Sequence, residues 1–182
     1  MATSKFWSDA SLEPKRQHRW LLYVGGEPVP GSTQGTFGIP TYVVKRVTKP
    51  QFNISETIHS FFGHKFYYPG SVEWQTTSFT LVDPVDPDVS RKLYEALISS
   101  GYDIPDSQQV STLSKDLSVR ALGNIITLQQ LNAENIVVDQ FQLYNPWITS
   151  VEFGSLDYES DAMVEVTVTI RYDYATFDTG AA

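Results

Sequence analysis

The sequence contains no cysteine, and this absence removes several kinds of chemistry at once. No disulfide can stabilise the fold, and no thiolate can act as a nucleophile or as a metal ligand. Histidine is also scarce, with three residues in a chain of 182. The lack of cysteine agrees with assembly in a cytosol, and it excludes catalysis by a thiol.

Long apolar runs and an excess of basic charge are absent as well. The N-terminal segment 1–20 lacks the apolar core of a secretory signal, and no stretch approaches the ~20 apolar residues of a membrane-spanning helix. The 21 acidic and 13 basic side chains give a formal net charge of −8. A chain of this charge does not hold nucleic acid by neutralising phosphates, but its surface can let nucleic acid pass without binding it.

Aromatic residues are abundant, with 10 Phe, 10 Tyr and 4 Trp making up 13% of the chain. Aromatic side chains favour strands and interfaces, so this composition predicts a β-rich protein that associates. The length predicts a single domain over residues 1–182, with a polar N-terminal arm over 1–18 that carries Phe6 and Trp7.

Most of the chain has the pattern of short strands. We predict strands over 19–24, 41–49, 51–59, 65–68, 72–74, 77–82, 124–131, 136–144 and 147–153. Pro69-Gly70 is expected to separate two of them, and Asn132–Asn135 to form a hairpin turn. The sequence therefore predicts a mainly β protein, an antiparallel sandwich or barrel with one flanking α-helix.

The last strand is predicted to be unusually long. From Met163 to Phe177, Val164, Val166, Val168, Ile170, Tyr172 and Tyr174 alternate with polar residues. An unbroken strand of this length reaches roughly 50 Å at ~3.4 Å per residue, whereas the radius of gyration of a compact domain of this size is roughly 16 Å. We infer that β-structure extends beyond the core and is completed by other copies of the chain.

The principal helix is predicted after residue 86. Asp86 is expected to cap it, Pro87 to occupy its first turn and Gly101 to follow its end. An apolar stripe formed by Val89, Leu93, Ala96 and Leu97 is expected to pack on a sheet. A second, short helix is predicted over 114–122.

Candidate metal and catalytic groups are few. His59 and His64 are too few for a zinc site without cysteine. The acidic groups Asp83, Asp86, Asp88 and Asp157, Glu159, Asp161 lack the spacing of a calcium loop, and helix capping and solvated loops are the favoured interpretations. Gly31, Gly35 and Gly38 are not followed by the Lys-Ser/Thr of a phosphate-binding loop. No cofactor or metal is therefore expected, and no enzymatic activity.

Several motifs together extend over most of the sequence: Tyr144–Ile148, Val151–Tyr158, Ser160-Asp161, Arg171–Tyr174, Phe66–Gly70, Thr80–Pro84, Ala121–Asn124 and Pro14–Gln17. In these motifs the chain resembles the tail tube proteins of contractile-tailed bacteriophages. The resemblance implies a small β-sandwich or barrel, six copies per ring, and rings stacked into a hollow tube inside a contractile sheath. It further implies that DNA passes through the lumen and that the sheath, baseplate and tail-terminator proteins are partners. The expected locations are the virion tail and, during assembly, the host cytoplasm.

Two sets of residues are expected to serve this role. The first set forms contacts between subunits, with basic residues meeting acidic loops of the next ring: Tyr42, Lys45, Arg46, Lys49, Phe52, Asp83 and Asp86. The second set forms a wet strand face that lines the lumen: Glu165, Thr167, Thr169 and Arg171. Nucleic acid is the other partner that the basic residues suit.

Three other functions stay open at this stage. A baseplate protein that initiates the tube and a tube protein of a secretion system share the same fold. A protein of another class, a sandwich-fold enzyme or small-molecule binder, requires a pocket with convergent polar groups and shifted pKa values.

Overall fold

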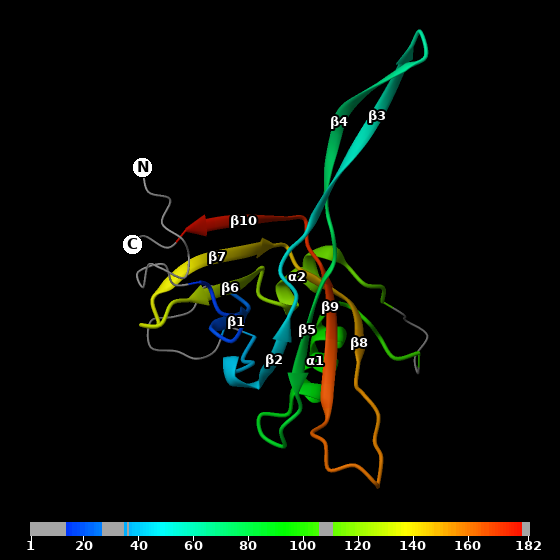
Figure 1. Ribbon diagram of the computed structural model, residues 1–182. Helices are drawn as coiled ribbons and strands as arrows, with labels where there is room; N and C mark the ends of the chain where they lie inside the picture. Colours follow the sequence, from blue (N-terminus) through cyan, green and yellow to red (C-terminus); the bar gives the residue numbers. More distant parts are fainter. Residues whose placement is uncertain (1–13, 27–34, 36, 106–110, 180–182) are drawn as a thin grey trace.

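The computed structural model describes residues 14–26, 35, 37–105 and 111–179. Most of the predicted N-terminal arm, including Phe6 and Trp7, lies outside these ranges, as does Gly31. The described chain is mainly antiparallel strand with two short helices, as the sequence predicted. Figure 1 shows a body of strands and helices from which one long hairpin projects.

Ten strands form two sheets and a separate hairpin within the described residues. The strands are β1 Trp20–Val24, β2 Val44–Val47, β3 Phe52–Phe61, β4 His64–Trp74, β5 Thr77–Val82, β6 Ile125–Leu131, β7 Val137–Tyr144, β8 Trp147–Glu152, β9 Glu165–Arg171 and β10 Tyr174–Thr179. One sheet has the order β1-β6-β7-β10 and the other the order β2-β5-β9-β8, while β3 pairs with β4. Every pair is antiparallel.

The core lies between the inner faces of the two sheets and the helices. On β9, Val166, Val168 and Ile170 are fully buried, and they alternate with half-buried polar residues. Phe79 and Leu81 of β5 pack beside them in the same cluster. A strand shows this alternation when one face of its sheet packs against a core and the other faces water. The inward face predicted for this strand is therefore confirmed.

The unbroken strand predicted over Met163–Phe177 is wrong. The chain bends after β9 at Tyr172-Asp173, and β10 then joins the other sheet. Tyr172 is buried, but the next inward residue is Ala175, so the alternation shifts by one position at the bend. Tyr174 lies outside and stacks on Tyr144 with ring centroids 4.7 Å apart. An aromatic residue on the wet face therefore concealed the shift in the sequence pattern.

Strand β4 also differs from the prediction, because it continues through Pro69-Gly70. The register shifts between Ile54 and Glu56, which gives β4 one extra residue at this point. Gly70 lies so close to Ser55 that a Cβ would meet the Ser55 Oγ at 2.3 Å. Proline lacks a backbone donor, and it is tolerated here because β4 pairs on one side only.

The segment 41–49 is shorter as a strand than predicted. A 3-10 turn, Thr41–Val43, precedes β2, and β2 ends at Val47 before Pro50. Elsewhere the turn prediction is confirmed: the Asn132 side chain accepts hydrogen bonds from the backbone N–H groups of Glu134 and Ile136, each at 2.9 Å. That turn joins β6 to β7 and fixes their pairing.

Helix α1 (Val89–Ser99) is capped differently from the prediction. Asp88, not Asp86, is the N-cap and accepts from the Arg91 backbone N–H at 2.8 Å. Asp83 reaches the same end and accepts from the Val89 and Ser90 N–H groups at 3.1 and 3.2 Å. Pro87 consequently precedes the helix and is not part of its first turn.

The C-terminal end and the apolar face of α1 agree more closely with the prediction. Gly101 follows the C-cap with φ +99°, where a Cβ would lie 2.9 Å from the Thr112 carbonyl oxygen. Val89, Leu93 and Ala96 are buried, whereas Leu97 is 40% exposed. The second helix, α2 (Lys115–Ala121), lies within the predicted range 114–122.

Replacing Val168 with aspartate tests the placement of β9. Val168→Asp puts an unpaired carboxylate into the core at a cost of several kcal/mol, so we expect no cooperative unfolding transition. The matched control is Thr169→Asp, because the next residue points to the outer face. Circular dichroism melting measures both, and a soluble Val168→Asp protein that melts cooperatively near the wild-type temperature contradicts the placement.

Candidate functional site

The β3–β4 hairpin is the most exposed part of the described chain. Every residue of β3 is exposed, and so is every residue of β4 before Trp74. Ten residues of strand extend over roughly 34 Å at ~3.4 Å per residue, and Figure 1 shows the hairpin leaving the body without a neighbour. Two strands alone are only marginally stable in water, so this element lacks the packing that would hold its conformation.

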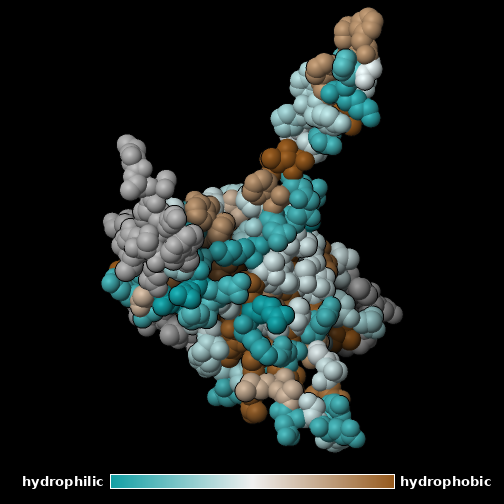
Figure 2. All heavy atoms as spheres, in the orientation of Figure 1, coloured by the Kyte–Doolittle hydropathy of each residue, from teal (hydrophilic) through white to brown (hydrophobic). Residues whose placement is uncertain are grey.

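One face of the hairpin is an apolar stripe. The register places Phe52 opposite Trp74, Ile54 opposite Val72 and Ile58 opposite Tyr67, all on the same face. Phe52, Ile54, Val72 and Tyr67 are each more than half exposed. In Figure 2 tan and brown side chains mark the base and the tip of the projection. Glu56, opposite Pro69, lies on the same face between Ile54 and Ile58. Exposed apolar side chains gathered on one face mark a site of interaction with another molecule.

The base of the hairpin is fixed to the core. The Phe52 and Trp74 rings meet edge to face with centroids 5.3 Å apart, and the Trp74 ring lies 6.0 Å from that of buried Tyr172. Arg171 Nη2 contacts Glu73 Oε1 at 3.0 Å. The body therefore holds the root of the hairpin, while its apolar stripe extends into solvent.

The candidate metal groups do not converge. His59 and His64 both lie in the hairpin, opposite Phe66 and Phe61 respectively, and all four are exposed. Across the ranges that the structure describes, no three histidine or carboxylate side chains are placed to hold a metal ion. No described helix is long and apolar enough to cross a membrane.

The residues predicted to form a wet strand face do share one surface. Glu165, Thr167, Thr169 and Arg171 lie on the outer face of the β2-β5-β9-β8 sheet, each half-buried. Glu165 pairs with Lys45, and the Thr167 hydroxyl lies 3.5 Å from that of Thr80. Figure 2 shows pale and teal side chains over this sheet. That this face lines a lumen stays a prediction.

The residues predicted to contact neighbouring subunits are distributed over several surfaces. Tyr42 is 73% exposed in the turn before β2, Phe52 is at the hairpin base, and Asp86 is exposed. Asp83 is different, because its carboxylate is engaged by the start of α1. It is therefore poorly placed to meet a basic residue of another copy.

The predicted basic residues line a groove between β2 and the other sheet. Lys45, Arg46 and Lys49 meet Lys15 there, beside the rings of Trp20 and Phe141. The groove has a volume of about 660 Å³. Lys15 was not predicted to belong to this groove. The only indication in the sequence was its position in the basic segment 15–19. The sequence cannot show that this segment returns to β2.

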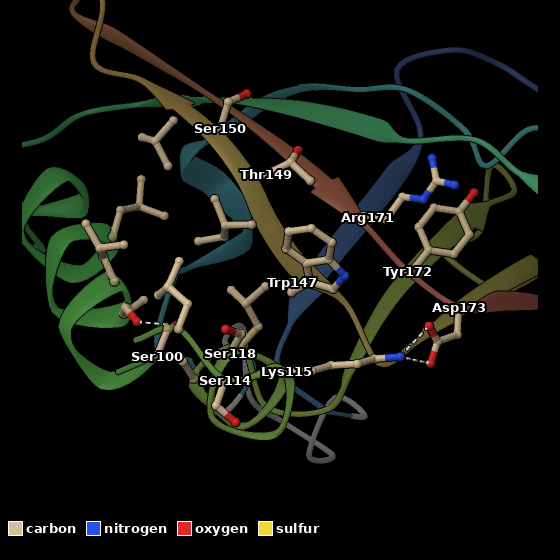
Figure 3. Close-up of a pocket in the computed structure, with 18 of the residues that line it drawn as sticks. Ser100, Ser114, Lys115, Ser118, Trp147, Thr149, Ser150, Arg171, Tyr172 and Asp173 are labelled. Carbon is tan, nitrogen blue, oxygen red and sulfur yellow. Dashed lines mark hydrogen bonds and ion pairs between the residues drawn. The ribbon is translucent and has the colours of Figure 1, made fainter. Parts of the chain in front are cut away.

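A second pocket, shown in Figure 3, lies between the two helices and β8, with a volume of about 880 Å³. Trp147, Arg171 and Tyr172 line one side of it. Apolar side chains line most of the rest, with the hydroxyls of Ser100, Ser114 and Ser118 among them. Lys115 Nζ donates to both carboxylate oxygens of Asp173 at 2.8 Å. The pocket thus has the convergent polar groups that an enzyme or binder would need.

The electrostatics of this pocket do not favour acid–base catalysis. Hydrogen bonds from Lys115 and Asn145 lower the pKa of Asp173, which makes its carboxylate a weaker base. Burial raises the pKa of the Tyr172 phenol, against smaller opposite effects of the Gln51 backbone and the Arg171 charge. Both groups therefore keep their ordinary charge at neutral pH. No histidine lines the pocket, and a general base needs a pKa near the working pH.

Comparison with solved structures finds other chains with this architecture. The chain superposes on a chain from the tube-terminating cap of the anti-feeding prophage with a TM-score of 0.66 at 17% identity, over 98% of this chain and 99% of that one. It also matches a chain from the sheath/tube terminator of an extracellular contractile injection system, with a TM-score of 0.64, 16% identity and coverage of 92% and 98%. No protein-family model and no curated protein matches the sequence.

The chain shares its fold with components of contractile injection particles. A third match, from the sheath–tube complex of the same extracellular system, has a TM-score of 0.60 and 16% identity over 98% of this chain and 99% of that one. The resemblance seen in the sequence is therefore confirmed at the level of the fold. These structures are described as a tube-terminating cap, a sheath/tube terminator and a sheath–tube complex.

The Lys115–Asp173 pair yields a prediction about acid. Because the pKa of Asp173 is lowered in the folded state, the pair stabilises the fold above the ordinary aspartate pKa. That contribution is lost as the pH falls through the lowered value. We expect Lys115→Met to raise the pKa of Asp173 toward normal in an NMR titration. Arg120→Met, which breaks only the Asp116 pair, is the control. An unchanged titration of Asp173 in Lys115→Met contradicts the assignment.

Proposed function

We propose that this chain is a structural subunit that assembles with copies of itself into a hollow tail tube. Six copies form a ring, and rings stack into a tube of the kind that contractile-tailed bacteriophages use to deliver DNA. The whole chain, residues 1–182, acts as one tail-tube domain. The observation that carries the proposal is the β3–β4 hairpin, whose apolar stripe is unpaired within the described chain.

The hairpin supplies the driving force for association. Within one copy, little of the surface of its apolar side chains is buried. Packing them against another copy stabilises the assembly by roughly 25 cal/mol for each Å² of apolar surface buried. A contact of at least ~1,000 Å² is the usual size of a stable interface. A projecting hairpin can reach past its own ring, so it suits the contact between stacked rings.

The sheet edges supply a second reason for assembly. Strands β1 and β10 end one sheet, and β2 and β8 end the other, and each pairs on one side only among the described strands. Unpaired strand edges promote association, and closing a sheet around a ring removes them. A ring of copies is thus a way to complete the backbone hydrogen bonds that one copy leaves open.

The outer face of the β2-β5-β9-β8 sheet suits a lumen. Short hydroxyl side chains, Thr167 and Thr169 on β9 and their partners on β5, provide a wet surface without a concentration of positive charge. The ion pairs of Glu165 with Lys45 and of Arg171 with Glu73 leave little net charge there. With a chain of net charge −8, such a surface lets DNA slide past without binding.

This function brings definite partners. A sheath protein surrounds the tube, and baseplate and tail-terminator proteins end it. The subunit is located in the virion tail, after assembly in the host cytoplasm. A tube-end role is the second candidate, because two of the similar structures are described as terminators. A protein that ends a tube is expected to form single rings and not filaments.

Negative-stain microscopy of the purified protein tests the proposal, with hairpin variants as the probe. Ile54→Ser combined with Ile58→Ser changes the apolar face, and we expect it to abolish stacked rings while the body still melts cooperatively. Thr57→Ser combined with His59→Ser is the matched control on the opposite face of β3 and should assemble normally.

Two results would contradict the proposal. One is a wild-type protein that stays monomeric at every concentration, even when seeded with fragments of preformed tube. The other is normal stacking by the Ile54→Ser, Ile58→Ser variant. Single rings without stacking would favour the tube-end role.

A further inference from the structure

The loop that joins β8 to β9 is an acidic projection. Residues 153–164 contain three carboxylates, Asp157, Glu159 and Asp161, and no basic side chain. Between them Tyr158 is fully exposed, and Leu156 is 87% exposed. Figure 1 shows the loop extending from the end of the body opposite the hairpin. Exposed aromatic and aliphatic side chains flanked by carboxylates are suited to enter a groove that is both basic and aromatic.

Such a groove is present elsewhere on the same chain. The basic groove defined above by Lys15, Lys45, Arg46 and Lys49 concentrates four positive charges in a chain of net charge −8. Its walls also contain the rings of Trp20 and Phe141. The groove therefore complements the loop in two ways: its cations suit the carboxylates of the loop, and its aromatic surface suits the exposed ring.

Internal carboxylates neutralise only part of this charge. Lys15 pairs with Asp139, and Lys45 pairs with Glu165. Lys49 contacts only the neutral Gln130 amide oxygen at 2.6 Å and lies 6.0 Å from the Phe141 ring centroid. The Arg46 side chain is exposed and forms no ion pair with the described carboxylates. Two positive charges are thus available for another molecule.

The loop and the groove lie on different sides of one molecule. The loop extends past the ends of β8 and β9, whereas the groove lies beside β2 and the β1-β6-β7-β10 sheet (Figure 1). A contact between them therefore joins two copies through unlike surfaces. Contacts of this heterologous kind generate closed rings or open helical stacks.

We propose that the loop 153–164 of one copy docks into the basic groove of the next. The carboxylates of Asp157 and Glu159 meet Arg46 and Lys49, and the Tyr158 ring packs between Trp20 and Phe141. This inference rests on the proposed self-assembly and names the surfaces that make one of its contacts. It differs from the prediction made from the sequence, in which Asp83 and Asp86 meet these basic residues; of the two, Asp83 is engaged within its own chain.

Nucleic acid is the other class of partner that a basic, aromatic groove fits. The net charge of −8 opposes it, since nucleic-acid binding depends on neutralising phosphates. Only two of the four cations are unpaired, which is few for a phosphate-binding surface. Complementary charge on the same chain favours a second copy.

A charge swap in the full chain tests the proposal. The groove variant is Arg46→Glu with Lys49→Glu, and the loop variant is Asp157→Lys with Glu159→Lys. Either variant alone should raise the critical concentration for assembly about tenfold or more, measured by sedimentation. The two combined should restore assembly, because the attraction returns with its sign reversed. Combining the groove variant with Asp103→Lys and Glu134→Lys, two exposed acids on other loops, should not.

A labelled peptide of residues 153–164 gives a readout that does not need assembly. Fluorescence anisotropy should detect its binding to the wild-type chain, weakening as salt rises, and no binding to the groove variant. If the wild-type chain binds the peptide but never assembles, the docking stands and the tube proposal fails.

Three results overturn the docking alone, provided that wild-type tubes form and the apolar hairpin variant does not stack. The first is normal assembly by the groove variant. The second is a combined variant that assembles no better than either parent. The third is binding of a short DNA duplex that the groove variant loses while it still assembles, which would assign the groove to nucleic acid. Absence of both assembly and peptide binding overturns both proposals.

Discussion

The proposed assembly depends on one constraint, which is that an apolar two-stranded hairpin in water has too few contacts to hold itself. The chain fixes its base through Phe52, Trp74 and Tyr172 and leaves the stripe beyond them exposed. The body does not need this element, since its core is closed by two sheets and two helices. Apart from Trp74 at its base, which packs against the core, the hairpin is ordered without burying its side chains in its own molecule, so contacts between molecules explain why the chain contains it.

The sequence predicted those parts of the fold that local chemistry determines. Alternation along β9 identified its buried face, and the Asn132 side chain and Gly101 ended their elements where expected. The errors arose where distant contacts decide. At the bend, Asp173 accepts hydrogen bonds from Lys115 and Asn145, which are distant in the sequence, and β4 can pass through Pro69 because no third strand among those described pairs with it. Neither condition is visible in a local pattern.

The candidate surfaces were predictable to a similar extent. Lys45, Arg46 and Lys49 are close in sequence and were recognised as one basic group, whereas Lys15 joins them only through the return of the chain past Gln130. The apolar stripe was predictable in part. The periodicity of the sequence places Phe52, Ile54 and Ile58 on one face of β3, but their partners on β4 are known only from the register in the structure. The sequence predicted that the last strand extends beyond the core. In the structure the β3–β4 hairpin is the element that does so.

Hydrogen exchange of the β3–β4 amides tests the central claim most directly. In the free subunit, amides from Ile54 to Val72 should exchange within seconds while those of β9 stay protected, because no packing holds the hairpin closed. In the assembled particle the same hairpin amides should become protected by orders of magnitude. Equal, strong protection of the hairpin in the free subunit, unchanged on assembly, would contradict the account.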